Sequence, residues 1–413
     1  MHHVIIGTGP AGVNAAEVLR KHDANSKITL IGGEGEPPYS RMAIPYVLSG
    51  NISEAGTRLR QEPGYYDTAR IEVIAGPVAR LDTLHKLVEL AGGNAVNYDR
   101  LLIAAGASPI KPHVPGLDLP GVHHCWTLAD MRAIEEQAGE GDNVVLMGAG
   151  FIGSIILESL KSRGVNLTVV EVEDRMVPRM LDETAGALLK SWCEGKGVNI
   201  RTATRIEKVE EANTGLDIHL SDGETLGAKL LVVAAGVKPN TDFLEGSGIE
   251  VDYGILVDER QQTNIEGVFA AGDIARSRDF STGSAVMMAI QPVAVDHARV
   301  AATNMAGGNA RYQGALAMNV LDTMGLISTS FGLCHGPASE KSAVALDEPG
   351  YKYMRLEFDG DVLVGAQSLG LPEHIGVLRG LIQSGAPLGT WKERLAENPL
   401  RLAEAYVGIT NGV

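Results

Sequence analysis

Two glycine clusters have the residue types and spacing with the clearest chemical use in this sequence. Each cluster reads G-x-G-x-x-G, and the six glycines are Gly7, Gly9, Gly12, Gly148, Gly150 and Gly153. Glycines at this spacing permit a tight turn and let a pyrophosphate approach the backbone, and a helix that follows them supplies free N–H groups and a positive dipole end. Because the motif occurs twice, the sequence predicts two dinucleotide sites in one chain.

The segments around the two glycine clusters follow the same order of predicted elements. Residues 2–22 and 143–164 each begin with a short β-branched run and continue, after the glycines, with apolar residues at helical spacing. A second predicted strand follows each helix, at residues 27–33 and 166–172. The pattern predicts two βαβ units, and the distance between their starts leaves room for a full domain.

Further predicted strands end at residues that suit a nearby ligand. Two apolar strands end in Ala-Gly, at Gly106 and at Gly236. A third, within residues 263–275, ends at Gly272 and Asp273. This spacing predicts one carboxylate at the carboxyl end of a parallel sheet, which is where α/β folds bind ligands.

The paired glycine motifs, the Ala-Gly strand ends and the Gly-Asp motif together resemble the FAD-dependent pyridine nucleotide-disulfide oxidoreductase superfamily, in its single-flavin branch. The resemblance covers residues 1 to about 310 with specific motifs and the remainder more loosely. It implies an α/β fold with two Rossmann-like dinucleotide-binding domains, one for FAD and one for NAD, plus a smaller α+β C-terminal domain.

The resemblance assigns FAD to the first glycine cluster and implies the contacts of that site. Residues expected at the diphosphate or the adenine are Gly7, Gly9, Pro10, Ala11, Gly12, Val78, Ala105 and Gly106. Asp273, beside Gly272, is expected to bind a ribityl hydroxyl. Family members hold the adenosine ribose with a carboxylate near the end of the second strand. Gly33 occupies one such place here and Glu34 the next, so Glu34 is the predicted ribose ligand.

Two other elements are expected beside the flavin. Arg41, in a PYxR-like pattern, would lie near the flavin or its phosphates. Residues 289–308 predict a helix with Pro292 in its first turn, where a missing N–H costs little. In the family this helix directs its N-terminus at the pyrimidine edge of the flavin, which would stabilise the negative charge of the reduced ring. The same residues also suit ordinary core packing.

By the same resemblance, the second glycine cluster is expected to hold the nicotinamide nucleotide. Phe151 and Ile152, between its last two glycines, are included in the predicted site. Glu171 ends the following strand, close to where an acid should meet a ribose 2′-hydroxyl. Its charge would repel a 2′-phosphate, so the sequence favours NADH over NADPH. Arg175 and Arg179 lie just beyond and could weaken that preference.

The loop at residues 37–50 carries the reactive group in many relatives, but here it has no thiol. Met42 stands where the disulfide, peroxide and oxygen reductases have cysteine, and methionine cannot form a mixed disulfide. Carrier-reducing relatives pair a lysine with a glutamate, and the corresponding positions here are Tyr46 and Ile155. Met42 and Tyr46 are therefore expected to shape an apolar flavin pocket. Electrons would leave directly from the flavin, because hydride transfer needs orientation and no protein acid or base.

The last hundred residues show a different pattern of predicted secondary structure from the two βαβ units. Residues 356–370 predict a β-hairpin, and residues 374–385 and 391–407 predict helices. The predicted domains are an FAD-binding domain at 1–118 and 247–312, an NAD-binding domain at 119–246, and an interface or dimerisation domain at 313–413. Residues 312–333 resemble the dimerisation domain of NADH oxidases and coenzyme-A disulfide reductases more than the tail of a carrier reductase, which supports an oxidase or reductase function, and the presence of a third domain favours a homodimer.

The composition of the chain limits which binding partners and which cellular location we expect for the protein. A net charge of −16 argues against nucleic acid and against an anionic membrane surface as partners. Cys125, Cys193 and Cys334 have no paired or metal-like spacing, and His123 and His124 are expected in a connecting segment, so no metal site is predicted. The sequence shows neither a signal-peptide pattern nor an apolar run near 18 residues, which predicts a soluble, cytoplasmic protein.

Three functions fit these residues. The leading one is an FAD-dependent oxidoreductase that takes hydride from NADH and passes electrons to rubredoxin, ferredoxin or a partner subunit. The second is an oxidase or reductase for oxygen, quinone, coenzyme-A disulfide or another sulfur compound, without the usual cysteine. The third is a flavin-bearing redox sensor or scaffold. The protein would recognise its electron acceptor by surface shape and charge, so no motif in the sequence identifies that acceptor.

Overall fold

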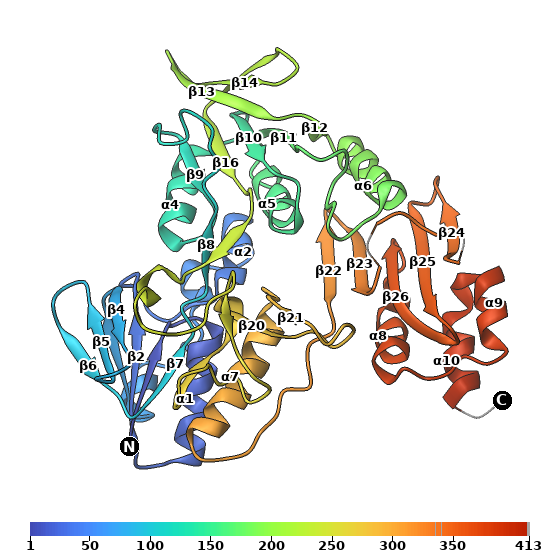
Figure 1. Ribbon diagram of the computed structural model, residues 1–413. Helices are drawn as coiled ribbons and strands as arrows, with labels where there is room; N and C mark the ends of the chain where they lie inside the picture. Colours follow the sequence, from blue (N-terminus) through green and yellow to red (C-terminus); the bar gives the residue numbers. More distant parts are fainter. Residues whose placement is uncertain (335, 340, 411–413) are drawn as a thin grey trace. The chain divides into compact units, whose positions relative to one another are not determined.

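The structure is a computed structural model that describes residues 1–334, 336–339 and 341–410. The chain divides into two compact units (Figure 1). Unit 1 comprises Met1–Val47, Ile52–Ser108 and Val237–Ala315, and unit 2 comprises Leu48–Asn51, Pro109–Gly236 and Leu316–Val413. The α/β fold class predicted from the sequence is confirmed, since each unit is built around a parallel sheet with helices.

Unit 1 is centred on a five-stranded parallel sheet in the order β19-β7-β1-β2-β3. Its strands are β1 (His2–Ile6), β2 (Lys27–Gly32), β3 (Ile71–Ala75), β7 (Arg100–Ile103) and β19 (Val268–Ala270). Strand β1 is almost entirely buried, as expected for a sheet covered on both faces. Helix α1 (Pro10–His22) connects β1 to β2, which confirms the first predicted βαβ unit.

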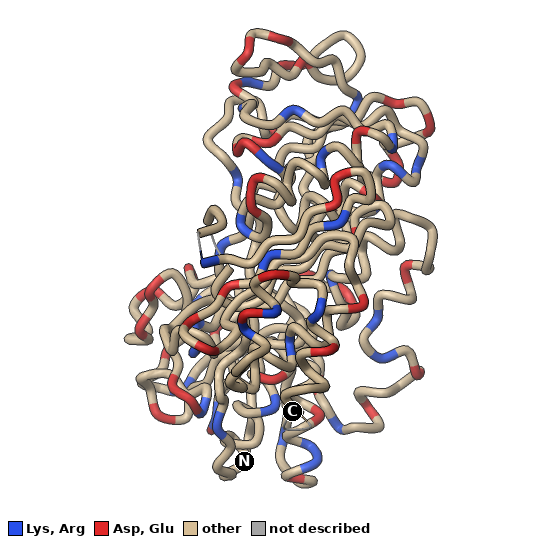
Figure 2. Tube along the Cα trace, turned by 90° about the vertical axis from the view of Figure 1, so that its right-hand side faces the viewer, with Lys and Arg blue, Asp and Glu red and all other residues tan. Residues whose placement is uncertain are grey.

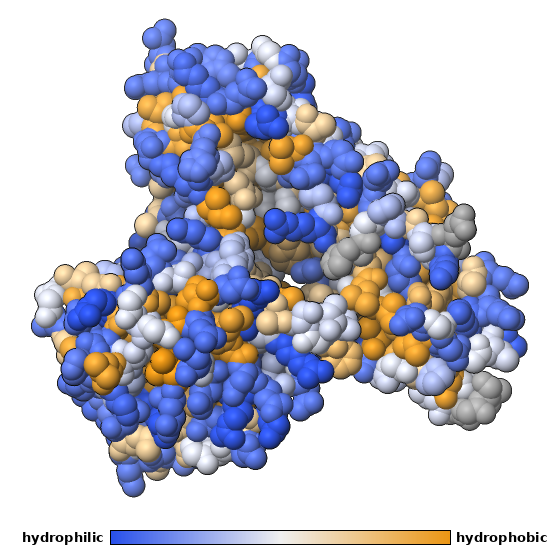
Figure 3. Space-filling model, in the orientation of Figure 1, coloured by the Kyte–Doolittle hydropathy of each residue, from blue (hydrophilic) through white to orange (hydrophobic). Residues whose placement is uncertain are grey.

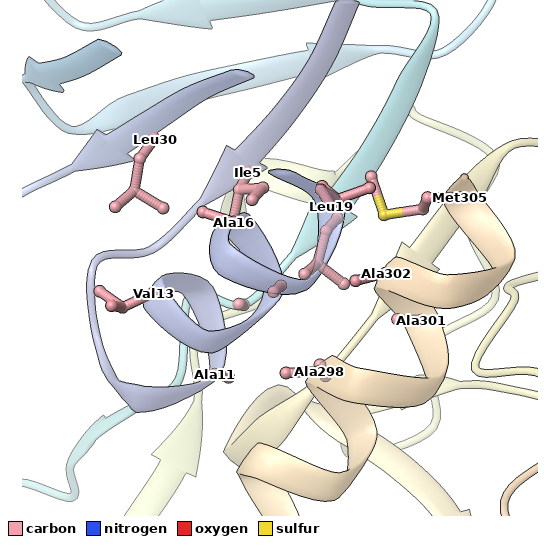
Figure 4. Packing of buried hydrophobic residues seen from close by; sticks show 14 of the residues in the cluster. Ile5, Ala11, Val13, Ala16, Leu19, Leu30, Ala298, Ala301, Ala302 and Met305 are labelled. Atoms are coloured by element: carbon pink, nitrogen blue, oxygen red, sulfur yellow. The ribbon is translucent and has the colours of Figure 1, made fainter. Parts of the chain in front are cut away.

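Helices α1 and α7 (Gln291–Met305) pack on each other through small side chains (Figure 4). Ala11 and Ala16 of α1 and Ala298, Ala301 and Ala302 of α7 belong to one buried core. Alanines at a helix contact let two backbones approach closely, so the N-terminal ends of both helices are fixed by the same packing. The predicted helix at 289–308 is confirmed, with Pro292 in its first turn.

The opposite face of the unit 1 sheet is covered by a small antiparallel sheet. It consists of β4 (Val78–Asp82), β5 (Leu87–Leu90) and β6 (Ala95–Asn97). Shorter elements of the unit are α2 (Ile44–Leu48), α3 (Tyr65–Thr68), β8 (Ala107–Pro109), β17 (Val237–Pro239), β18 (Ile255–Leu256), β20 (Ala275–Arg278) and β21 (Ala285–Val286). A second core joins the two sheets.

Unit 2 contains the second βαβ arrangement, on a parallel sheet in the order β12-β11-β10-β16-β9. The strands are β9 (Val122–His124), β10 (Asn143–Met147), β11 (Asn166–Val170), β12 (Asn199–Arg201) and β16 (Leu230–Val233). The helices are α4 (Leu128–Gln137), α5 (Phe151–Lys161) and α6 (Glu183–Gly195). An antiparallel sheet of β13 (Ile206–Ala212), β14 (Gly215–Leu220) and β15 (Thr225–Ala228) completes this part.

The expected connecting segment at His123 and His124 is wrong. Both residues lie in edge strand β9, in parallel register with Val232 and Val233 of β16. The strand is only three residues long, too short for a periodic pattern, so its pairing is set by the neighbouring strand rather than by local sequence.

The C-terminal segment forms an antiparallel sheet in the order β22-β23-β26-β25-β24 with helices on one face. Its elements are β22 (Met318–Thr323), β23 (Leu326–Gly332), β24 (Ala343–Asp347), β25 (Lys352–Asp359), β26 (Val362–Leu369), α8 (Ile375–Ser384), α9 (Trp391–Glu397) and α10 (Leu402–Thr410). The predicted hairpin and the helix at 374–385 are confirmed. The helix predicted at 391–407 is wrong as one element, because it is divided into α9 and α10 by a short 3-10 turn that begins at Pro399, which has no N–H to continue the helix. The segment has its own core but belongs to the same compact unit as the second βαβ fold, so the three-domain boundaries remain a prediction.

Candidate functional site

The first glycine loop turns tightly because two of its glycines have no room for a side chain. Gly7 has φ +114°, and a Cβ there would lie 2.1 Å from the carbonyl oxygen of Ala104 at the end of β7. A Cβ on Gly12 would lie 1.9 Å from the carbonyl oxygen of Gly7. Both glycines are therefore required by the fold, since any larger residue would overlap backbone.

Gly9 has a different role, because the space in front of it is open. It is the N-cap of α1, with φ −76° and no side-chain capping hydrogen bond, and a Cβ there would meet no atom within 4 Å. Pro10 is the first helical residue. Uncapped N–H groups and the positive end of a 13-residue helix thus face a space that a Cβ would fill. This geometry fits the diphosphate of a dinucleotide.

Asp273 provides a carboxylate that receives no hydrogen bond from any residue the structure describes. It follows Gly272, which has φ +77° and where a Cβ would lie 3.4 Å from the Cβ of Ala11 in α1 and 3.5 Å from that of Ala294 in α7. Burial raises the pKa of Asp273 to about 6, the charge of Arg41 opposes that rise, and no hydrogen bond contributes. A half-buried carboxylate of this kind can accept a hydrogen bond from a ligand hydroxyl.

Arg41 and Glu34 form an ion pair at the end of β2. The Tyr39 hydroxyl donates to the other oxygen of the same Glu34 carboxylate at 2.6 Å. About a third of each charged side chain remains exposed. The structure thus brings two predicted site residues together, and the assignment of Glu34 to a ribose remains a prediction.

The loop that carries Met42 is tied to the start of α7. The Ser40 hydroxyl donates to the side-chain oxygen of Gln291, the first residue of that helix, at 2.8 Å. Pro292 follows, and α7 has no side-chain cap at its N-terminus. Sequence reasoning missed this contact, because Ser40 and Gln291 lie 251 residues apart and neither stands in a recognisable motif.

Met42 and Tyr46 project from the loop rather than into the core of unit 1. Their exposed fractions are 50% and 57%. Other large apolar side chains of the structure, such as Leu84 and Tyr253, are at least as exposed, so this exposure leaves the two residues accessible to a ligand without identifying one. Their predicted contact with a flavin remains a prediction.

Asn240 fixes the backbone of Ala105 and Gly106, which are predicted to contact the adenine or the diphosphate of FAD. Its side-chain amide donates to the carbonyl oxygen of Ala105 at 2.8 Å, and its backbone N–H donates to that of Gly106 at 3.0 Å. Gly106 has φ +66°, which favours glycine. Val78, half-buried, begins strand β4 of the small antiparallel sheet. Asn240 was not among the predicted site residues.

The second glycine loop repeats the geometry of the first. A Cβ on Gly148 would lie 2.5 Å from the carbonyl oxygen of Ala234, and one on Gly153 would lie 2.1 Å from that of Gly148. Gly150 is the N-cap of α5, without a side-chain cap, and a Cβ there would meet nothing within 4 Å. The loop therefore also fits a diphosphate. The Ala-Gly strand ends now have a physical reason, because each presents an alanine carbonyl to the first glycine of a loop.

Other predicted residues of the second site surround this loop. Phe151 and Ile152, the first two residues of α5, are half-buried. Gly236, with φ +111°, lies beyond the end of β16, and a Cβ there would approach only the side chain of Ile110. These positions are compatible with the predicted site, and the contacts of the three residues with a nucleotide remain a prediction.

Glu171 is held directly against the second glycine loop. Its carboxylate accepts the N–H of Ala149 at 2.6 Å and the N–H of Glu173 at 2.9 Å, one on each oxygen. Only 6% of the residue is exposed. The predicted ribose ligand therefore also fixes the loop that would receive the diphosphate.

Glu171→Gln is expected to raise the dissociation constant for NADH about tenfold, with FAD content unchanged. Glutamine has one acceptor oxygen, so one of the two N–H groups would lose its partner, and a hydrogen bond to a charged group contributes about 1.5–3 kcal/mol. An anaerobic NADH titration measures the change. Glu173→Gln removes the same charge from an exposed side chain, and an equal loss there would mean that charge, not loop geometry, is responsible.

The three cysteines are buried and carry no reactive thiolate. Burial raises the pKa of Cys125, Cys193 and Cys334 to about 12 each. A thiol that stays protonated is a poor nucleophile and a poor redox relay. Among the described residues, no group of three or more His, Cys, Asp or Glu side chains could hold a metal ion.

Comparison with known proteins places the chain among flavoprotein reductases. The family model described as pyridine nucleotide-disulphide oxidoreductase matches residues 1–302. Over 416 aligned residues, the sequence is 35% identical to the NADH-dependent phenylglyoxylate dehydrogenase subunit epsilon of Aromatoleum evansii, covering 99% of this chain and 97% of that one.

Two further similarities extend over most of the chain. The ferredoxin–NAD(+) reductase component of the Burkholderia cepacia anthranilate 1,2-dioxygenase system is 30% identical, with 98% of each chain covered. The solved structure of a NAD-dependent persulfide reductase from A. fulgidus matches with a TM-score of 0.87 and 28% identity, over 94% of this chain and 78% of that one.

Proposed function

Because the chain belongs to the pyridine nucleotide-disulphide oxidoreductase family and is an FAD-dependent NAD(P)H oxidoreductase, we propose that it passes electrons from NADH to a separate redox carrier or partner subunit. The observation that carries the proposal is the repeated loop geometry. Gly9 and Gly150 each leave open space before an uncapped helix, and three buried cysteines offer no thiol relay.

A bound flavin would supply the chemistry that the side chains lack, since it accepts a hydride from a nicotinamide and releases electrons to an acceptor. The residues of this chain would bind and orient. Gly9 and the start of α1 would bind the FAD diphosphate, and the Asp273 carboxylate would accept a hydrogen bond from a hydroxyl of FAD. The uncapped N-terminus of α7 would favour negative charge beside it, an effect on the order of 1 kcal/mol.

We assign NADH rather than NADPH to the second loop. Glu171 lies at the loop, and the side chains of Glu173 and Asp174 are exposed just beyond it. Arg175 donates to the Asp174 carboxylate at 2.6 Å and to the carbonyl oxygen of Leu181 at 3.1 Å. The charge of Arg175 is therefore largely neutralised by Asp174. A carboxylate about 4 Å from a 2′-phosphate would oppose binding by up to about 4 kcal/mol at an effective dielectric near 20.

The acceptor is proposed to be a protein. Similarity along nearly the full chain to a subunit of one dehydrogenase and to a ferredoxin reductase component supports a carrier or partner subunit. A sulfur compound is the second candidate, favoured by the likeness to a persulfide reductase. Figure 2 shows acidic and basic residues interspersed along the chain, so a carrier would have to recognise a local arrangement of charges rather than a uniform field.

Anaerobic titration of the purified yellow protein tests the proposal. NADH should bleach the flavin, and NADPH should do so only at much higher concentration. The reduced protein is then mixed in turn with ferredoxin, rubredoxin, oxygen, a quinone, coenzyme-A disulfide and a persulfide. Rapid reoxidation by a carrier supports the proposal, and rapid reoxidation only by a small oxidant supports the second candidate. A long-lived reduced protein with altered oligomeric state would instead indicate a redox sensor.

Replacing each cysteine singly with alanine is expected to leave the NADH-to-carrier rate within about twofold, because transfer without a thiol relay needs no thiolate. The rate is measured in parallel with the melting temperature, since the truncation leaves a small cavity in a buried site. Loss of carrier reduction in a folded, FAD-loaded Cys334→Ala protein would show that a thiol takes part.

A homodimer through the C-terminal segment remains part of the proposal. This segment exposes several large apolar side chains, namely Val320, Leu333, Val344, Leu346, Leu400, Tyr406 and Val407. Figure 3 shows apolar atoms gathered over this part of the chain. The exposed side chains come mainly from both edge strands of the sheet and from its helices, and exposed apolar surface of this extent supports an interaction surface on this segment. No helix among the described residues has the length and hydropathy needed to cross a lipid bilayer. A cytoplasmic location remains a proposal.

A further inference from the structure

A buried polar network joins the C-terminal sheet to the nucleotide-binding fold within unit 2. We define it as the Asp182 network, formed by Asp182, Tyr353, Arg355 and Gln367. Asp182 is the N-cap of α6, where one carboxylate oxygen accepts the N–H of Ala185 at 3.0 Å. The other oxygen accepts the Tyr353 hydroxyl at 2.6 Å and lies 3.3 Å from Nη1 of Arg355. The exposed fractions of the four residues are 6%, 2%, 2% and 1%.

The remaining polar groups of the network also have partners. Arg355 donates through Nε to Glu357 at 2.6 Å. Gln367 accepts the backbone N–H of Asp182 at 3.0 Å and donates to the carbonyl oxygen of Cys334 at 2.7 Å. Burial raises the pKa of Tyr353, so its hydroxyl stays a donor at neutral pH. A buried network in which each charge is paired fixes a single geometry.

Residues 171–182 connect this network to the second glycine loop. At the start of this segment, Glu171 accepts the N–H of Ala149, and in its middle the N–H of Val177 donates back to the carbonyl oxygen of Ala149 at 2.8 Å. Val177 has φ +49°, a strained value for a β-branched residue, and its carbonyl oxygen accepts the N–H of Leu181 at 3.0 Å. Such a conformation persists only where its surroundings hold it on both sides.

We propose that the Asp182 network positions the nicotinamide-nucleotide loop, so that the C-terminal sheet acts on NADH binding through Asp182 and residues 171–182. This inference rests on the proposed assignment of NADH to the second loop. The glycine loop is fixed at one end of the segment by Glu171 and Val177. The opposite end is fixed by side chains whose positions are set by a different sheet. Asp182 and Tyr353 are positioning residues, because neither contacts the loop itself.

Tyr353→Phe tests the inference, since it removes only the hydroxyl that donates to Asp182. The variant is expected to raise the NADH dissociation constant and the KM for NADH about fivefold, with kcat and FAD content unchanged. Binding is measured by anaerobic titration of the FAD-loaded protein, and turnover with ferricyanide as acceptor. Asp182→Asn, which keeps the capping oxygen but removes the charge, is expected to change NADH affinity in the same direction.

Tyr351→Phe is the matched control, because its hydroxyl lies 3.5 Å from Ser191 Oγ near the other end of α6. It should leave NADH affinity within twofold. If Tyr353→Phe and Asp182→Asn lower the melting temperature but leave NADH affinity within twofold, the network is merely structural and the inference is wrong. Failure of the proposed function has a different signature, because the unaltered protein itself would then not bind NADH.

Discussion

Gly9→Ala is expected to remove most of the FAD affinity while the protein keeps its fold. The residue has ordinary φ, and a Cβ there meets no protein atom, so alanine should even raise the free energy of unfolding by about 0.4–1 kcal/mol. The same Cβ would occupy the space that a diphosphate needs in front of α1. Overpacking of a close contact costs about 1–3 kcal/mol, which corresponds to a complex weakened roughly fivefold to 150-fold.

The measurement pairs FAD titration of the FAD-free protein with thermal unfolding. Gly7→Ala is the contrasting variant, because its Cβ would lie 2.1 Å from the carbonyl oxygen of Ala104, and it should unfold unit 1. Gly92→Ala is the matched control, since a Cβ there also meets nothing and the residue lies in a turn far from the loop in sequence. Undiminished FAD binding by Gly9→Ala would refute the assignment of this loop to a diphosphate.

Gly150→Ala supplies the reciprocal result and tests which dinucleotide belongs to which loop. Its geometry matches that of Gly9, so it should weaken NADH binding to a similar degree and leave FAD bound. The two glycine loops are too similar for their geometry to distinguish the ligands. Loss of FAD from Gly150→Ala, with NADH binding retained, would reverse the assignment.

Asp273→Asn is expected to stabilise the FAD-free protein while weakening its complex with FAD. Burial raises the pKa of Asp273 from 3.8 to about 6, so the folded state holds its proton more tightly than the unfolded state. The free energy of unfolding of the unaltered protein should therefore fall as pH rises from about 4 to 6, by about 3 kcal/mol at most. The asparagine variant lacks this decline, so its advantage should be small at pH 4 and complete above pH 6.

The effect on FAD has the opposite sign. Within the described part of the chain no group donates a hydrogen bond to this carboxylate, and a ligand hydroxyl donating to a charged acceptor contributes about 1.5–3 kcal/mol. Asp273→Asn should therefore weaken FAD binding roughly tenfold to hundredfold at neutral pH. Denaturant unfolding of the FAD-free protein at several pH values and FAD titration at pH 7 measure the two effects. If stability and affinity fall together, Asp273 serves the protein's own fold rather than a ligand.

The Asp273→Asn substitution is expected to raise the free energy of unfolding and to lower the affinity for FAD. These opposite effects illustrate that a ligand-binding residue can destabilise the ligand-free protein. A largely desolvated carboxylate that receives no hydrogen bond destabilises the protein until a ligand supplies a donor. Glu171 and Arg355 differ in this respect, because backbone or side-chain groups already satisfy them. The unsatisfied group points to a ligand, whereas the satisfied groups fix loops that a ligand would use.

The sequence by itself determined the features that depend on local spacing. Both βαβ units, the two glycine loops and the Gly272-Asp273 strand end were readable, because helices, strands and tight turns impose periods and glycine positions on a short stretch of chain. The absence of a thiol at Met42 was readable for the same reason, since it is a matter of one position within a motif.

Only the tertiary structure decided which groups those loops rest on. Ser40 meets Gln291, Asn240 holds Ala105 and Gly106, and Tyr353 reaches Asp182 across 171 residues of sequence. The short edge strand at His123 and His124 was likewise set by its neighbour. Such contacts have no period and no fixed spacing, because they join elements whose separation along the chain is arbitrary. In each contact the partner is selected by shape and burial in the folded molecule. These two properties arise only once the elements that carry the two residues have packed together.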